Sequence, residues 1–431
     1  MIRRYMRPAM GKIWDEGNKF RIWLDIELLA CEAQAELGRI PREAVEVIRA
    51  RARFDVARIE EIERVVKHDV IAFLTNVGEH VGPESRFIHL GMTSSDILDT
   101  CLSVQMKQSG ELLMDGLKKL RDVLARRAKE HKRTIMVGRT HGIHAEPTTM
   151  GLKFALWYEE AKRNIRRLEG AIERISVGQI SGAVGTYEHL SPSVEEFVCA
   201  RLGLEPAPVS TQIIQRDRHA EYMSVLALIG GSLEKIATEI RHLQRTEVLE
   251  AEEYFSEGQK GSSSMPHKRN PITCERIAGL ARLLRGNALA AMENVALWHE
   301  RDISHSSVER VVVPDSCIVL DYILHLAIDV VDRLILYPQN MLKNLELTHG
   351  LIFSQSVLLA LTQKGMNRED AYRLVQGLAM ETWHARCDFR ELLKRDPEVT
   401  SVLSGGEIDA LFDLERSIAN IDHIFTRVGL N

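Results

Sequence analysis

The sequence predicts an all-α protein whose centre is a bundle of unusually long helices. From Tyr222 to Leu243 the apolar residues recur at alternating spacings of three and four, the period of one helix face. That face consists of Val225, Leu226, Ile229, Leu233, Ile236, Ile240 and Leu243. No segment shows a convincing alternation with period two. We therefore expect helices almost throughout and no sheet of consequence.

Residues 1–93 are expected to form a small helical domain. The pattern of apolar residues predicts shorter helices near residues 21–37 and 55–77. Gly82 and Pro83 mark a turn after them, because glycine and proline interrupt regular structure.

Residues 94–341 are expected to form the long-helix bundle. One helix follows the group Ser94, Ser95 and Asp96, which can cap it, and another follows Pro147, which suits a first helical turn. The apolar positions of the first are Ile97, Cys101, Val104, Leu113, Leu117, Leu120 and Leu124; those of the second, which runs toward Ile175, are Leu152, Leu156, Tyr158 and Leu168. Two further helices are predicted over residues 274–298 and 314–336.

Residues 342–431 are expected to form a third domain of shorter amphipathic helices. Asn367 can cap one of these helices, and Gly405 with Gly406 marks a break. The bundle helices are too long to bury all their apolar stripes within one subunit, so partner subunits should complete the core. We expect a homo-oligomer, and an elongated monomeric bundle is the alternative.

Composition and charge exclude several classes of protein. The formal net charge of −5 gives no general attraction to nucleic acid or to an anionic membrane. The N-terminus lacks the apolar run of a signal peptide, and the most apolar stretch, residues 311–337, is interrupted by aspartates. The cysteines are far apart, without CxxC pairs, which is typical of reduced thiols. We expect a soluble, cytoplasmic protein.

Residues 256–271 are expected to form a mobile lid that carries chemistry. Its sequence from Gly261 to Pro271, GSSSMPHKRNP, combines three hydroxyls, an imidazole, two cations and a carboxamide. Glycines free the backbone, and prolines prevent the preceding helix from continuing. Composition alone favours a solvated surface loop, because Ser, Gly and Pro are common in such loops, and it is the order of the residues that favours the lid.

Three further clusters place polar side chains near a helix end or in the first domain. In GMTSSD, residues 91–96, hydroxyls precede free helix amides, which suit a carboxylate or phosphate; ordinary capping explains Ser95 or Asp96. In RDISHSSVER, residues 301–310, an Arg fork backed by hydroxyls suits a phosphate, and a solvated helix terminus is the alternative. The third is Lys67-His68-Asp69. We interpret His242, His299 and His305 as structural.

The sequence RTHGIHAEP, residues 139–147, contains two histidines three positions apart. A metal site is disfavoured, because no cysteine or carboxylate cluster completes a coordination sphere and a loop before a helix is a poor scaffold. A general acid needs only one imidazole whose pKa lies near neutrality. We therefore favour an acid–base role without a metal.

These motifs together resemble those of the fumarase and aspartase superfamily, whose members release fumarate by β-elimination. GMTSSD, GRTHGIHAEPTT, GSSSMPHKRNP and ERDISHSSVER stand in the order of its adenylosuccinate lyase branch, and the resemblance covers essentially the whole chain. It implies a homotetramer whose helices assemble into one core, with active sites shared between subunits. It also implies cleavage of adenylosuccinate to AMP and fumarate, and of SAICAR to AICAR, in purine biosynthesis.

The resemblance also implies roles for individual residues. His141 matches the general acid and Ser262 the general base, while His68 and His89 match histidines that contact or orient the substrate. Matches to nucleotide-phosphate contacts are Arg4, Tyr5, Arg301, Ser306 and Arg310. Matches to other substrate contacts are Lys67, Asp69, Thr93, Ser94, Gln212, Ser263, Lys268 and Asn270. The partners implied are small nucleotide substrates, with neither nucleic acid nor membrane.

One position departs from the family's pattern and leaves the base open. The family commonly has Ala or Thr where this chain has Ser264, so three hydroxyls are adjacent. Ser263 and His68 are the alternatives to Ser262 as the base. A serine acts as a base only if its alkoxide is stabilised, which requires a closed lid that supplies amides and cations.

The expected reaction requires proton transfer and electrostatic stabilisation, and it calls for no metal, flavin or nicotinamide cofactor. Proton removal beside a carboxylate creates a doubly charged intermediate, and Lys268 and the lid amides are suited to stabilise it. His141 as an imidazolium can protonate the departing nitrogen. Rival interpretations are a sister lyase, a muconate cycloisomerase on the same scaffold, or an inactive helical scaffold protein; His267, the RTHG tetrapeptide and the retained lid serines argue against them.

Overall fold

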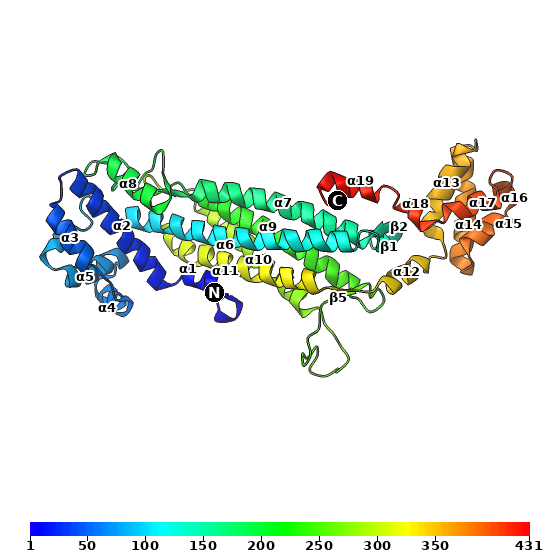
Figure 1. Ribbon diagram of the computed structural model, residues 1–431, viewed down its shortest axis with the longest axis horizontal. Helices are drawn as coiled ribbons and strands as arrows, with labels where there is room; N and C mark the ends of the chain where they lie inside the picture. The colour runs from blue at the N-terminus through cyan, green and yellow to red at the C-terminus, as the bar shows by residue number, and fades with distance from the viewer. The chain divides into compact units, whose positions relative to one another are not determined.

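The computed structural model describes all residues from 1 to 431, and its elements are mostly helices (Figure 1). The all-α prediction is confirmed. Contacts divide the chain into two compact units. Unit 1 comprises residues 1–118, 163–234 and 276–326, and unit 2 comprises residues 119–162, 235–275 and 327–431. This division follows contacts and not sequence order, so the predicted domain boundaries after residues 93 and 341 stay a prediction.

The N-terminal part of unit 1 consists of short helices around an aromatic core. Its elements are η1 (Arg3–Tyr5), α1 (Pro8–Ile13), α2 (Glu16–Glu36), α3 (Arg42–Arg51), α4 (Val56–Val66), α5 (Asp69–Val81) and η2 (Pro83–Phe87). Phe20, Trp23 and Phe73 pack together there, with ring centroids 5.1 to 5.8 Å apart. Such close aromatic pairs add to the stability that burial alone supplies.

The prediction of a single helix over residues 55–77 is wrong, because the helix is interrupted at Lys67. This residue ends α4 with a left-handed backbone, φ 57°, and His68 caps the start of α5. A left-handed residue cannot continue a right-handed helix. The break places Lys67, His68 and Asp69 at a helix junction, which a continuous helix would not do.

Five long helices form the bundle, as predicted, and each contributes residues to both units. They are α6 (Ser94–Glu130), α7 (Met150–Ile175), α9 (Asp217–Leu243), α10 (Ile272–Glu293) and α11 (Ser304–Arg333). Every apolar position predicted for the faces of α6 and α9 is buried. Periodicity therefore located these two faces correctly.

The apolar face predicted for α7 is partly wrong. Leu156 is 59% exposed, whereas Phe154 and Trp157 on the adjacent stripe are buried. The helix itself begins at Met150, three residues after Pro147, and ends at Ile175 as predicted. Because apolar residues occur on two sides of α7, the pattern alone could not show which side faces the chain's own core.

The bounds predicted for the last two bundle helices also change. The helix predicted over residues 274–298 runs from 272 to 293, and the one predicted over 314–336 begins ten residues earlier, at Ser304. Pro314 lies inside α11, so the helix continues through a residue that has no backbone N–H to donate. The first turns of α11 therefore carry Ser306 and Arg310, which a start at Pro314 would leave in a loop.

By length and composition alone, α11 would pass as a membrane-spanning helix. Most of its apolar window is buried inside the chain, and the helix as a whole carries Asp315, Asp321, Asp329 and Asp332. Core helices of soluble proteins have the same properties. The burial makes α11 a core helix of the bundle.

The structure contains three short sheets of two strands each, so the expectation of no sheet needs one correction. Strands β1 (Ile135–Thr140) and β2 (Ile143–Thr149) form an antiparallel hairpin in which Val137 pairs with Pro147. The other pairs are β3 (Val177–Gly178) with β4 (Glu205–Pro206), and β5 (Ala251–Glu252) with β6 (Ile335–Leu336). RTHGIHAEP thus lies in a hairpin and not in a loop before a helix. Because Pro147 was interpreted as the start of a helix, the second strand was not predicted.

The remaining helices are short. They are α8 (Pro192–Leu202), α12 (Pro338–Glu346), η3 (Leu351–Phe353), α13 (Ser354–Gln363), α14 (Arg368–Ala385), α15 (Phe389–Arg395), α16 (Pro397–Thr400), α17 (Gly405–Leu411), α18 (Leu414–Ser417) and α19 (Ile421–Val428). Asn367 caps α14, as predicted, by accepting a hydrogen bond from the Glu369 amide. The predicted break at Gly405 is the start of α17, where Ser404 and Glu407 form a capping box.

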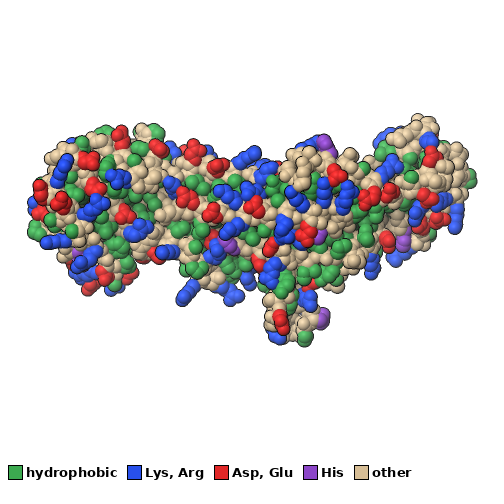
Figure 2. All heavy atoms as spheres, in the orientation of Figure 1, with side chains coloured by type: hydrophobic (Ala, Val, Ile, Leu, Met, Phe, Trp, Pro, Cys, Tyr) green, Lys and Arg blue, Asp and Glu red, His purple; other side chains and the backbone are tan.

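The surface mixes charges of both signs and includes apolar residues on the bundle helices. Basic and acidic side chains are interspersed on the face drawn in Figure 2. Leu156 of α7, Leu228 of α9 and Leu289 of α10 are exposed. All six cysteines are free, and all but Cys387 are buried. Large apolar side chains on the exterior of bundle helices are a feature of surfaces that other chains cover.

Candidate active site

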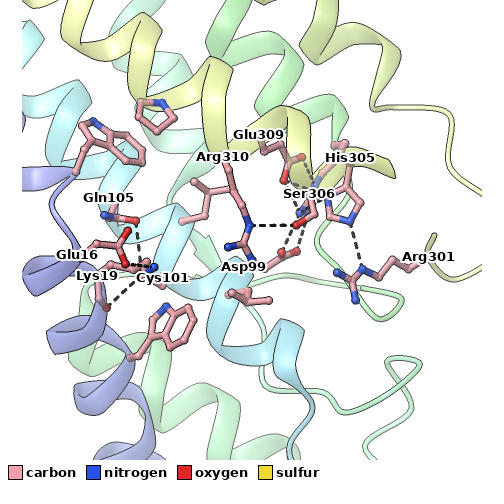
Figure 3. Close-up of a pocket in the computed structure, with 16 residues that line it drawn as sticks. Glu16, Lys19, Asp99, Cys101, Gln105, Arg301, His305, Ser306, Glu309 and Arg310 are labelled. Atoms are coloured by element: carbon pink, nitrogen blue, oxygen red, sulfur yellow. Dashed lines mark hydrogen bonds and ion pairs between the residues drawn. The ribbon is translucent and has the colours of Figure 1, made fainter. Parts of the chain in front are cut away.

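A cavity of about 220 Å³ in unit 1 collects three of the five predicted phosphate contacts, and Arg4 and Tyr5 do not line it (Figure 3). Arg301, Ser306 and Arg310 line one part of it, and Trp14 and Trp23 line another. The cavity lies among α2, α6 and the start of α11. Guanidinium groups beside the N-terminus of a helix are suited to an anion such as a phosphate.

Two side chains hold Arg301 at this cavity. Its Nη1 donates to Oε1 of Gln212 over 3.0 Å, and its Nε donates to Nε2 of His305 over 3.3 Å. The backbone carbonyl of Gln212 in turn accepts a hydrogen bond from Gln179 over 2.7 Å. Gln212, which the resemblance matches to a substrate contact, therefore binds Arg301 in this structure.

Arg310 joins the start of α11 to the start of α5. Its Nη2 lies 2.5 Å from Oδ2 of Asp69, and its Nε lies 3.4 Å from the hydroxyl of Ser306. Burial opposes ionisation of Asp69, but the hydrogen bond and charge of Arg310 outweigh it and lower the pKa of this carboxyl. Three predicted site residues, from two distant parts of the sequence, are thus in one chain of contacts.

A buried ionic network lies behind Arg301. Arg216, 1% exposed, makes paired hydrogen bonds to Asp99 over 2.6 and 2.9 Å and to Glu309 over 2.7 and 3.0 Å. Burial would raise the pKa of Glu309, but His305 and Arg216 together lower it to about 2. A buried cation paired with two carboxylates and fully hydrogen-bonded avoids the large cost of an isolated charge. The network fixes α6, α9 and α11 to one another at the cavity.

Sequence reasoning missed Arg216, and it treated His305 as structural. A lone arginine near the start of a helix carries no motif signal. His305 and Glu309 are four residues apart, which places them on one face of a helix, and this spacing could have indicated a functional pair.

His89 and His68 lie in unit 1 with defined partners. His89, at φ 64°, places Nδ1 2.7 Å from the buried carboxylate of Glu27. Burial disfavours its charge, but Glu27 and Asp96 outweigh burial and raise the pKa of His89. His68 caps α5, because its Nδ1 accepts from the Ile71 amide over 3.4 Å. Neither histidine lines the cavity of Figure 3.

Backbone amides in and near the GMTSSD segment already donate to Asp96, so they are not free to bind an anion. Asp96 is buried and accepts from the amides of Thr93, Ser181 and Gly182 over 2.8 to 3.3 Å. Burial raises the pKa of Asp96 to about 6 despite these bonds. The capping interpretation therefore applies to Asp96, while the hydroxyls of Thr93 and Ser94 are half-buried.

The N-terminal segment carries Arg4 and Tyr5 and is attached along α11. The α-amino group of Met1 lies 2.5 Å from Asp315, and Nη1 of Arg7 lies 2.7 Å from the buried Asp321. Tyr5 packs on Tyr322 with ring centroids 5.5 Å apart. Arg4 is exposed on η1. These attachments bring the segment to the helix whose first turns carry Ser306 and Arg310.

In unit 2, His141 occupies the tip of the β1–β2 hairpin. His141 and Gly142 both have positive φ, 55° and 80°, as the two central residues of a type I′ turn require. A left-handed histidine costs backbone energy, and such strain concentrates at functional sites. Its side chain is exposed.

The base of this hairpin turn is attached to a buried carboxylate. Arg139 donates two hydrogen bonds to Glu250 over 2.8 and 2.9 Å, and Asn344 donates a third over 2.8 Å. Burial and the charge of Arg139 lower the pKa of His144, which favours its neutral form. A charge-assisted, paired hydrogen bond of this kind orients the strand that leads into His141.

The lid, residues 256–271, also belongs to unit 2 and extends as an irregular loop near β5 (Figure 1). The hydroxyl of Ser262 accepts from the backbone amides of Ser264 and Met265 over 3.3 and 3.1 Å. Ser263 and Ser264 are exposed. Asn270 donates to the carbonyl of Gly261 over 2.9 Å and so closes the loop at its base.

A hollow of about 750 Å³ lies at the foot of the lid. Lys268, His267 and Asn270 line it, together with Arg241 and His242. Neither His141 nor Ser262 lines this hollow. Within one chain, then, the site residues form two groups: the phosphate-type residues in unit 1, and His141 with the lid in unit 2.

Comparisons with known proteins agree on one family. The model of a family described as Lyase matches residues 3–286, and one described as Adenylosuccinate lyase C-terminus matches residues 350–428. Adenylosuccinate lyase of Synechocystis sp. is 57% identical over 431 residues, and that of Bacillus subtilis is 54% identical over 430, with 100% of each chain covered.

Solved structures show the same fold. Fumarate lyase from Mesorhizobium sp. BNC1 has a TM-score of 0.91 and 27% identity over 98% of both chains. The 3-carboxy-cis,cis-muconate lactonizing enzyme from Pseudomonas putida has a TM-score of 0.90 and 30% identity over 98% of this chain and 96% of its own. The scaffold is therefore shared with the rival cycloisomerases, and sequence identity over the full length separates them. This chain belongs to the fumarase and aspartase superfamily and, within it, to the adenylosuccinate lyase family.

Proposed function

We propose that this chain cleaves adenylosuccinate to AMP and fumarate, and SAICAR to AICAR and fumarate, with His141 as general acid and Ser262 as general base. As a member of its family it is a carbon–nitrogen lyase of purine biosynthesis. The reaction is a β-elimination, in which one proton leaves carbon and another reaches the departing nitrogen. Both substrates are phosphorylated, so a phosphate site is required.

The cavity of Figure 3 carries the proposal of a nucleotide substrate. Arg301 and Arg310 approach it from the first turns of α11 and the loop before them, with the hydroxyl of Ser306 between them in sequence. Arginine forks are efficient receivers of phosphate, because each guanidinium offers paired charge-assisted hydrogen bonds. A substrate without a phosphate would leave these cations without a ligand.

The contacts of Ser262 favour it over Ser263 as the base. Two backbone amides point at its oxygen, and the same bonds would stabilise that oxygen as an alkoxide. Ser263 is exposed and has no such pair. His68, the other alternative, has its Nδ1 occupied by the Ile71 amide.

His141 and Lys268 supply the remaining chemistry of the proposal. An imidazolium at the hairpin tip can protonate the departing nitrogen, a contribution of about 10²- to 10⁴-fold. Lys268 lines the hollow under the lid, where its charge can stabilise the doubly negative intermediate that forms when the proton leaves carbon. Thr93, Ser94, Lys67 and Asn270 remain proposed substrate contacts.

Turnover without added cofactor tests the activity directly. The purified protein should convert both substrates, which the loss of absorbance of the succinylated compound would show, and no turnover of either substrate would exclude the function. His141→Gln should abolish turnover while retaining binding, because glutamine keeps the size and polarity but cannot donate a proton as an acid. A His141→Gln variant with a near-normal rate would remove this residue from the acid role.

We also infer a cytoplasmic homotetramer in which different subunits complete each active site. Its support is the exposure of Leu156, Leu228 and Leu289 on bundle helices, which partner helices would cover, and the free cysteines typical of a reducing compartment. Mixing His141→Gln with Arg301→Ala, assayed at a substrate concentration far below the KM of the Arg301 variant, tests the shared site, since hybrid tetramers can contain sites with both native residues. No recovery of activity after subunit exchange would contradict sharing between subunits.

A further inference from the structure

We propose that His305 is a positioning residue: as a neutral imidazole with its proton on Nδ1, it holds Arg301 in the orientation that receives the substrate phosphate. The inference rests on the proposed function, because it takes Arg301 to be a phosphate contact. His305 is 2% exposed and lies in the first turn of α11. It belongs to the wall of the cavity but is almost wholly buried, so we take it to act through Arg301.

The contacts of His305 define where its proton lies. Nε of Arg301 is 3.3 Å from Nε2 of His305, and a guanidinium has donors only, so Nε2 must be the acceptor. The proton of a neutral ring is then on Nδ1, which lies 3.1 Å from Oε2 of Glu309. Arg216 also lies 3.3 Å from Nδ1, but two donors cannot bond each other, so Glu309 is the partner.

Glu309 can impose this tautomer because it is ionised and immobile. The pKa of its carboxyl is lowered to about 2 by His305 and Arg216, despite burial. Arg216 binds both of its oxygens, over 2.7 and 3.0 Å. An ionised carboxylate only accepts hydrogen bonds, so it requires a proton on the nitrogen that faces it. The proton on Nδ1 in turn leaves the lone pair of Nε2 directed at Arg301.

A second arm of the same network holds the other side of Arg301. Oε1 of Gln212 accepts from Nη1 of Arg301 over 3.0 Å. Asp99 secures the loop that follows Gln212, because its Oδ2 accepts from the Ile214 amide over 2.8 Å, and Asp99 also binds Arg216. Both sets of contacts on Arg301 thus lead to the same buried network, in which Arg216 binds Asp99 and Glu309. They occupy Nε and one hydrogen of Nη1, which leaves the outer edge of the guanidinium for phosphate oxygens.

Two variants of His305 separate positioning from simple packing. In His305→Asn the amide reaches the place of Nδ1 and can donate to Glu309, but nothing accepts from Arg301. In His305→Gln the side chain reaches the place of Nε2, where its oxygen can accept from Arg301. His305→Asn removes one methylene more than His305→Gln, but a packing defect of that kind would weaken the binding of a nucleotide with and without its phosphate alike.

The experiment measures the KM for adenylosuccinate and the inhibition constant of succinyladenosine, its counterpart without the phosphate. For His305→Asn we expect KM to rise about 10- to 100-fold, the effect of losing a hydrogen bond to a charged group, with kcat little changed. The inhibition constant of succinyladenosine should stay at the wild-type value. His305→Gln should restore most of the affinity for adenylosuccinate.

An unchanged KM in His305→Asn, or an equal loss for both compounds, would overturn the proposal. If circular dichroism shows that His305→Asn does not fold, Glu309→Gln tests the same step, because a carboxamide no longer requires the proton on Nδ1. Glu309→Gln should also weaken adenylosuccinate selectively, and an unselective loss would again overturn it. Failure of the proposed function is distinguishable, since the wild-type protein would then show no turnover.

Discussion

The cavity of Figure 3 and the lid differ in how firmly their functional side chains are held. At the cavity, Arg301 is held by His305 and Gln212, which are themselves fixed by ions buried among three helices. The lid is an exposed loop whose catalytic candidate, Ser262, bonds only to amides within the loop. The cavity is therefore organised before any ligand arrives, whereas the lid belongs to the class of segments that open at low cost.

This difference indicates how the enzyme divides binding and chemistry. A rigid receiver for the phosphate positions the nucleotide, and positioning of this kind can supply much of a catalytic effect. The proposed acid and base, by contrast, lie on a hairpin tip and a loop, where water must be excluded before a weak base such as serine can act. Changes in the two regions should accordingly affect different measurements.

Replacing Ser262 should produce the largest effect on the rate. We expect Ser262→Ala to lower kcat about 10²- to 10⁴-fold, because the proposed base is lost, with KM much less affected. Initial rates at saturating adenylosuccinate check this. Ser263→Ala is the matched control and should retain most activity. If Ser263→Ala or His68→Ala lost as much activity as Ser262→Ala, the assignment of the base would change.

Replacing Arg216 should give the largest effect on stability. Arg216→Met leaves Asp99 and Glu309 buried without their cation, and we expect the free energy of unfolding to fall by about 3–5 kcal/mol. Denaturant-induced unfolding measures it. Arg218→Met is the control, since Arg218 donates only to the carbonyl of Arg174 near the surface. Equal stability of the two variants would contradict the importance of the buried network.

A methyl group at Gly261 should impair the lid without weakening the fold. A Cβ there would collide with the carbonyl of Lys268, so the two ends of the loop would have to separate. We expect Gly261→Ala to lower kcat about 10- to 100-fold, the order of effect of a displaced catalytic group, with an unchanged melting temperature. Gly377→Ala, where a Cβ meets nothing within 4 Å, is the control. A fall in melting temperature would show that the lid is part of the rigid core.

The pH dependence of stability should reflect the buried region and not the lid. Burial, aided by Arg216, lowers the pKa of His219 from 6.5 to about 4. Between these values the unfolded chain binds a proton that the folded chain does not, so stability falls as pH falls, by up to about 1.4 kcal/mol per pH unit. In His219→Gln the free energy of unfolding should depend less steeply on pH between pH 6.5 and 5, because unfolding then takes up about one proton fewer. An identical slope would assign the dependence to other groups.

Local patterns predicted the parts of the fold that depend on one segment at a time. The faces of α6 and α9 follow from apolar spacing, and Asn367 follows from capping chemistry. The hairpin at His141 was missed, because its strands carry polar residues and Pro147 resembles a helix start. The break at Lys67 was missed because its residue types are compatible with a continuous helix.

The candidate site shows the same limit. The motifs identified Arg301, Ser306 and Arg310 as candidate phosphate-binding residues, and the structure brings them to one cavity. No motif indicated Arg216, although this residue links Asp99 to Glu309 across more than two hundred positions of sequence. Whether His141, Ser262 and Lys268 meet in one site stays a prediction; the mixing experiment tests whether His141 and Arg301 of different subunits share one.

The sequence by itself determined the family, the helical class and which chemical groups are present, because motif order and apolar periodicity are properties of the chain read in one direction. Only the tertiary structure decided which of these groups meet. It paired Asp69 with Arg310, placed His141 in a left-handed turn and located the proton of His305. The reason is that a hydrogen bond or an ion pair depends on distances between segments, and those distances are set by how whole helices pack.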